Sequence, residues 1–218
     1  MKTLLFNIIL ICSLIEHCHG NSVDEALQAI AADLPNDKQT VAKVKSIQSS
    51  MPAPEVVREV MSALMANHAA AQDAAGVRFL LAMDPFPFDE LTKRYSSAQS
   101  SLERGVILRI FDLHFDFGMY QSAGSAKQGA GTGEQIRILK TIAISALADT
   151  DDAYTLDAGE NESGASPERV CDIGYNILVT ILSLQTTFPR INRNNDEHPQ
   201  RDILIDHLRT YLKTHQEK

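Results

Sequence analysis

The chain has 218 residues, a formal net charge of −8 and only three cysteines. An acidic chain lacks the basic face that attracts nucleic acids and anionic lipid surfaces, so its composition argues against both as partners. The length suits one domain that buries a substantial hydrophobic core, and the low cysteine count excludes a disulfide-stapled scaffold.

The first twenty residues (1–20) resemble a secretory signal peptide. A positive charge precedes an apolar run over residues 4–15, and the small residue Gly20 closes the segment. The run is shorter than the roughly 20 residues that a membrane span needs, and no later segment is apolar enough to insert stably. We expect cleavage after Gly20 and export of residues 21–218 to the periplasm or the exterior. A lipid anchor on Cys18 is the alternative.

The first half of the exported chain has helical periodicity, without the alternation that indicates a strand. Apolar side chains recur every three or four positions, and prolines or polar turns separate the runs. The expected helices cover residues 22–34, 38–50, 55–75 and 76–83, with one or two more over 88–115.

The sequence "MDPFPF" interrupts these helices, because proline fixes its own φ and pushes the preceding residue out of the helical region. Phe86 and Phe88 flank Pro87 in this extended segment. An exposed ring would suit a binding partner. The reading that we favour is that both rings cover the end of the core.

A motif of three metal-capable side chains, Asp112, His114 and Asp116, lies at the end of the 88–115 helical segment. Spacing of two residues brings side chains together on a strand or in a turn, whereas on a helix they diverge. We therefore assign no metal site here.

A stretch rich in glycine, alanine and serine near residues 122–131 has the composition of a flexible linker. Its final "GAGTG" lacks the lysine and hydroxyl of a nucleotide-binding loop, and no strand precedes it. Directly after it, Thr132 and Gln135 have the spacing of a capping box, which predicts the start of a helix.

An acidic loop near residues 149–165 follows that helix and offers the oxygen ligands that calcium prefers. An EF-hand register starting at Asp149 fails, because Ala153 and Tyr154 occupy its fifth and sixth positions. We interpret the segment as a solvated loop.

Two further helices complete the chain. Ser166 can cap the first, with Pro167 at its first helical position, and Pro189 ends it. In the last helix, Asp202 and Asp206 share a face and form a candidate carboxylate pair for acid–base work. Because nothing supplies a nucleophile, we assign it no catalytic role. Its inward residues are predicted to be Ile203, Leu204, Leu208, Tyr211 and Leu212.

Cys171, the one cysteine outside the predicted signal peptide, lies at the start of the first of these helices. A helix N-terminus and the nearby Arg169 would both stabilise a thiolate. The neighbouring Val170 belongs to a broad apolar face, however, and free cysteine is among the most buried residue types. We favour a buried core cysteine over a reactive thiol, with an intermolecular disulfide as the remaining alternative.

The segments "ISALADTDD" and "SPERVCDIGYNILVTIL" together resemble a HEAT-type helical repeat. Residues 132–186 span 55 positions, and 38 without the 17-residue insertion at 149–165, close to the roughly 40–47 of that class. A small residue such as Gly174 would let the paired helices approach closely. The residues that carry the resemblance are Ala146, Leu147, Asp149, Arg169, Val170, Gly174 and Leu178.

These observations predict a single all-α domain over residues 21–218, built from antiparallel helix pairs as a short HEAT-like α-solenoid or an irregular bundle. The resemblance implies a non-catalytic protein that binds another protein through a helix face or inserted loops. We assign no catalytic, cofactor-binding or metal-ligating residues. The alternatives are an exported hydrolase or metal-dependent enzyme, and a helical bundle that encloses a ligand.

Overall fold

The structure is a computed structural model. Within the ranges that it describes, the regular elements are helices and no β-strand is present, which confirms the all-α class. The predicted signal peptide, the 122–131 linker and residues 154–165 of the acidic loop lie outside these ranges. The described residues are 23–31, 37–66, 75–115, 132–153, 167–192 and 196–215.

The chain divides into two compact units, one ending at Leu91 and the other beginning at Thr92. The boundary falls inside helix α5 (Phe88–Ser97). The single domain expected over residues 21–218 stays a prediction.

The first unit contains a helical segment over residues 23–31 and three further helices that pack on one another. The apolar stripe that predicted a helix over 55–75 lies in α3, whose Val56, Val57, Val60, Met61 and Leu64 are buried. Close packing of α3 and α4 depends on Gly76, because a Cβ there would lie 2.7 Å from Leu64 Cγ. The three helices are α2 (Asp37–Ser50), α3 (Ala53–Ala66) and α4 (Ala75–Leu81).

The "MDPFPF" segment joins α4 to α5. Phe88 is buried and begins α5, whereas Phe86 is half-buried. The preferred reading, in which both rings cover the core, is therefore confirmed in full for Phe88 and in part for Phe86.

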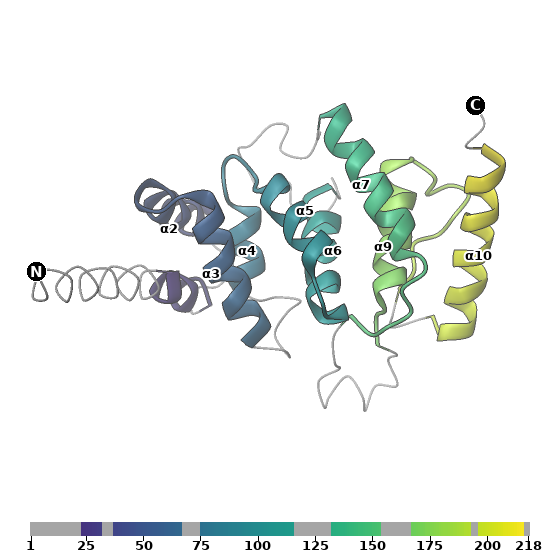
Figure 1. Cartoon of the computed structure of the whole chain (residues 1–218), viewed down its shortest axis with the longest axis horizontal. Coiled ribbons are helices and arrows are strands. Elements are labelled where there is room, and N and C mark those ends of the chain that lie inside the picture. The colour runs from purple at the N-terminus through teal and green to yellow at the C-terminus, as the bar shows by residue number, and fades with distance from the viewer. Residues whose placement is uncertain are drawn as a thin grey trace, which may run out of the picture. The chain divides into compact units, whose positions relative to one another are not determined.

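The second unit is arranged around α9 (Val170–Ile181), which packs against α6 (Ser101–Phe115), α7 (Gly133–Ala146) and α10 (His198–His215) (Figure 1). Ten of the twelve residues of α9 are buried, as expected for a helix with apolar residues on most sides. The 88–115 segment forms two helices, α5 and α6, separated by residues 98–100.

Two local predictions for α7 and α9 are confirmed. Thr132 Oγ1 accepts from the backbone N–H of Gln135 at 3.2 Å, and Gln135 Oε1 accepts from the N–H of Thr132 at 3.0 Å, which completes the capping box. Gly174 permits close packing, because a Cβ there would lie 2.8 Å from Ala146 Cβ and 3.0 Å from the Ala143 carbonyl oxygen.

The predicted start of α9 at Pro167 is wrong, because the helix begins at Val170 with Arg169 in an extended conformation as its N-cap. The residues before it instead pair with the base of the acidic loop. The N–H of Ala153 donates to the Glu168 carbonyl, and the N–H of Val170 donates to the Asp151 carbonyl. These bonds keep residues 167–169 out of the helix.

The predicted inward face of α10 is also partly wrong. Ile203 is 56% exposed, and Leu204 and Tyr211 are half-buried. The residues that face inward are spaced by four, three and four positions, which is one face of a helix. They are Arg201, Ile205, Leu208 and Leu212, so a charged side chain begins the buried face.

Candidate functional site

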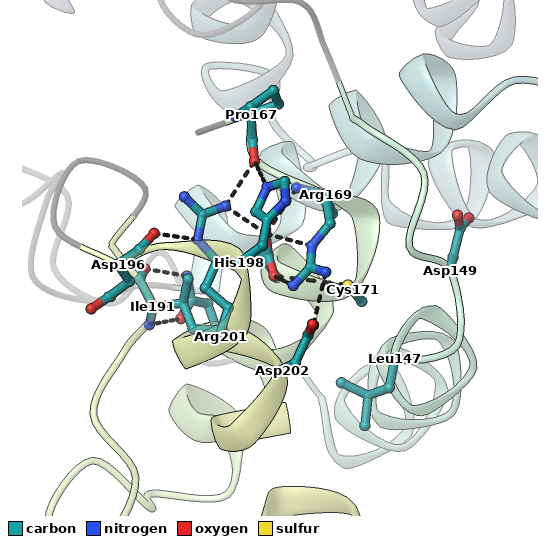
Figure 2. A network of polar contacts seen from close by, with 12 residues as sticks. Leu147, Asp149, Pro167, Arg169, Cys171, Ile191, Asp196, His198, Arg201 and Asp202 are labelled. Atoms are coloured by element: carbon teal, nitrogen blue, oxygen red, sulfur yellow. Dashed lines mark hydrogen bonds and ion pairs between the residues drawn. The ribbon is translucent and has the colours of Figure 1, made fainter. Parts of the chain in front are cut away.

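Four charged side chains of alternating sign connect the start of α9 to the start of α10 (Figure 2). Arg169 Nη1 donates to Asp202 Oδ1 at 2.8 Å, and Arg169 Nη2 donates to Asp172 Oδ1 at 2.9 Å. Arg201 Nη1 donates to Asp172 Oδ2 at 2.9 Å. We call Asp202, Arg169, Asp172 and Arg201 the ion chain; its formal charges sum to zero.

Asp172 is fully buried and serves two helices at once. Its Oδ2 accepts from the backbone N–H of Arg169 at 3.0 Å, which caps the N-terminus of α9. The same oxygen accepts from Arg201 of α10. The cap of one helix and the docking of the next therefore share a single carboxylate.

Arg201 is also fully buried, and its guanidinium holds two backbone carbonyls besides Asp172. Nη1 donates to the Pro167 carbonyl at 2.7 Å, and Nε donates to the Asp196 carbonyl at 2.8 Å. His198 Nε2 lies 3.2 Å from the same Pro167 oxygen, to which it can donate (Figure 2). The first turn of α10 thus binds the chain just before α9.

Polar contacts also fix the connection between α9 and α10. Tyr175 donates its hydroxyl to the Pro189 carbonyl at 2.8 Å, and burial raises the pKa of this phenol to about 12. Asn176 exchanges two bonds with Ile191, accepting from its N–H at 2.8 Å and donating to its carbonyl at 3.1 Å. The Asn176 amide therefore satisfies the backbone N–H and carbonyl of Ile191, which lies outside the helices and has no intrahelical hydrogen bonds.

A second buried carboxylate, Asp112 of α6, holds the same connection. Arg190 Nη2 donates to its two oxygens at 2.8 and 2.7 Å, and Arg109 Nη1 donates to it at 3.2 Å. Burial raises the pKa of Asp112, although Arg190 and Arg109 act in the opposite direction. The residue that the sequence motif offered as a metal ligand is thus bound to arginines.

His114, the second member of that motif, is half-buried on the same helix, and Asp116 lies outside the described residues. Burial lowers the pKa of His114 to about 4, so its imidazole is neutral at physiological pH. Within the described part of the chain, no three His, Cys, Asp or Glu side chains are placed to hold a metal ion.

The remaining carboxylates singled out in the sequence also have basic neighbours. Asp206 is exposed and accepts from Arg209 Nη1 at 2.9 Å, while Asp202 is held by Arg169. Asp149, at the base of the acidic loop, pairs with Arg104 of α6 at 2.7 Å. Asp202 and Asp206 therefore pair with different arginines.

Cys171 is buried, as its apolar surroundings favoured. Its Sγ lies 3.8 Å from Asp172 Oδ1. Burial raises the pKa of the thiol to about 12, and the Asp172 carboxylate adds to the shift although Arg169 opposes it. A thiol that stays protonated near neutral pH is a poor nucleophile, so this environment is the reverse of an activated cysteine.

The residues that organise the site were only partly recognisable in the sequence. Arg169 and Asp172 have opposite charges three positions apart at the start of an apolar helix, which is a signal for a local pair. The contact between Asp172 and Arg201 joins residues 29 positions apart, and no local sequence pattern predicts it. Tyr175 and Asn176 likewise reach backbone groups 14 and 15 residues away.

Comparison of the chain with family models, curated proteins and solved structures finds no match. Among the described helices, none combines the length and apolar character needed to cross a membrane.

Proposed function

We propose that the protein is an exported, non-catalytic helical protein that acts by binding another protein. The observation that carries this proposal is the pairing of the buried charges within the fold. Asp172 bonds to Arg169 and Arg201, and Asp112 bonds to Arg190 and Arg109. Catalytic groups have to meet a substrate, whereas these meet one another and hold helices together.

The packing of α7 on α9 supports the same proposal. Gly174 and Ala146 bring the two helices into close contact, as the resemblance of residues 132–186 to a HEAT-type pair implies. Stacked helix pairs of this kind form extended concave surfaces that bind other proteins. The neutral, high-pKa thiol of Cys171 gives no support to nucleophilic chemistry.

Binding can be tested by immobilising the purified protein and passing the exported fraction of its native source over it, with heat-unfolded protein as the control. We expect the folded protein alone to retain a partner. After purification, that partner should form a stable complex in light scattering and show saturable binding in calorimetry. Failure to form any complex, together with stoichiometric zinc or calcium in a metal analysis, would contradict the proposal and favour the metal-dependent enzyme.

Export is tested separately by sequencing the N-terminus of the protein recovered from its native source. Cleavage after Gly20 predicts a chain that begins at Asn21 and is found outside the cytoplasm. A chain that keeps Met1 and remains with the cell interior would contradict export without affecting the binding experiment.

A further inference from the structure

Helix α10 buries a much smaller share of its residues than its neighbour α9 does. Only four of its eighteen residues are buried, and one of the four is Arg201. In α9, ten of twelve residues are buried. Elements with a narrow apolar contact open more readily than the core around them, so the two helices should differ in local stability.

The ion pairs that α10 forms with α9 lie near the start of α10. Arg201 and Asp202 bind Asp172 and Arg169, the pair at the start of α9. Farther along, Arg209 donates to the Leu147 carbonyl, and the Tyr211 ring meets that of Phe188 edge-on at 5.3 Å. The apolar part of the contact consists of Ile205, Leu208 and Leu212.

Separation of α10 would not leave the buried Asp172 carboxylate unpaired. Asp172 would keep the N–H of Arg169 on Oδ2, at 3.0 Å, and the Arg169 guanidinium on Oδ1, at 2.9 Å. Asp202 is already 56% exposed in its side chain, and Arg201 would move into water. The usual penalty for breaking a buried ion pair, which is a stranded charge, therefore does not apply at Asp172.

The core beneath α10 would also remain supported. Helix α9 packs on α6 and α7 independently of α10, and its N-terminal cap is provided by its own Asp172. We propose that α10 detaches from the fold as a unit while α6, α7 and α9 stay folded. The ion chain holds α10 in the closed form. Opening uncovers the apolar faces that Ile205, Leu208 and Leu212 cover in the closed form.

The test is hydrogen–deuterium exchange, read by mass spectrometry, on the full chain. Peptides from α10 are compared with peptides from α9 in the wild type and in Arg201→Met, which removes the donor to Asp172 and to the Pro167 and Asp196 carbonyls. Asp202→Asn is a milder variant, because Arg169 keeps Asp172. The matched control is Arg137→Met, which removes an exposed pair with Glu134 on α7.

We expect α10 to exchange faster than α9 in the wild type, and about tenfold faster still in Arg201→Met, because the buried Asp172 and two part-buried carbonyls lose a donor. Asp202→Asn should show a smaller acceleration confined to α10, and Arg137→Met should show none. Equal exchange of α10 and α9 in the wild type and in Asp202→Asn would overturn the proposal. So would acceleration in Arg201→Met or Asp202→Asn that spreads equally over α9. The experiment needs no binding partner, so its result is independent of the proposed function.

Discussion

Asp172 of α9 and Arg201 of α10 form an ion pair at 2.9 Å with both side chains fully buried. Removing two charges from water is costly, and a buried pair persists where further hydrogen bonds satisfy the remaining atoms. Here those bonds come from the Arg169 backbone and guanidinium and from the Pro167 and Asp196 carbonyls. The pair thus specifies where α10 docks, which apolar contacts alone would specify less sharply.

Replacing Gly174 by alanine should weaken the packing of α7 on α9. The new Cβ would lie 2.8 Å from Ala146 Cβ and 3.0 Å from the Ala143 carbonyl oxygen. Because overpacking costs about 1–3 kcal/mol, the free energy of unfolding in urea should fall despite the better helix propensity of alanine.

Gly133→Ala is the matched control, since a Cβ there meets nothing within 4 Å. Its effect should be within about 0.5 kcal/mol of zero or slightly stabilising. Equal effects of the two substitutions would contradict the close approach at Gly174.

The register of α10 is tested by two isoleucines two positions apart. Ile205 is 3% exposed and Ile203 is 56% exposed. Ile205→Ala should lower the free energy of unfolding by about 2–5 kcal/mol, because it leaves a cavity. Ile203→Ala should change it by less than about 0.5 kcal/mol. Urea unfolding followed by circular dichroism measures both, and the reverse order would place the opposite face of α10 against α9.

His114 should make the protein less stable in mild acid. Burial lowers its folded-state pKa to about 4 from an ordinary value of 6.5, so the folded protein prefers the neutral ring. The stabilisation is therefore complete above pH 6.5 and is lost as the pH falls toward 4. The wild type should lose more Tm between pH 7.5 and pH 5 than His114→Gln does.

His207 lies exposed on α10, and His207→Gln is the control for that comparison. Its Tm should depend on pH as that of the wild type does. A His114→Gln protein whose Tm falls as steeply as that of the wild type would show that the ring is not protected from protonation.

The confirmed predictions rest on local signals. The capping box of Thr132 and Gln135 joins residues three apart, and the small size of Gly174 matters wherever two helices meet. Helical periodicity likewise identified the all-α class, because each buried face repeats within a few residues.

The missed features depend on contacts between distant segments. Arg201 can be buried because it donates to Asp172 and to the Pro167 carbonyl. Nothing near Arg201 in the chain indicates that these acceptors will be there. Ile205 lies on the same buried face of α10 as Arg201, whereas Ile203 is exposed, the opposite of its predicted orientation. The start of α9 was misplaced for the same reason, because residues 168–170 pair with residues 151–153.

A double-mutant cycle on Asp172 and Arg201 tests most directly whether the buried pair joins α9 to α10. Asp172→Asn alone should cost about 3–5 kcal/mol of unfolding free energy, because it removes the buried carboxylate that the Arg169 and Arg201 guanidinium groups share. Arg201→Met alone should cost about 1–3 kcal/mol. We predict that the double variant loses less than the sum of the two by at least about 1 kcal/mol. Additive losses would show that the two residues do not stabilise each other and would contradict the account.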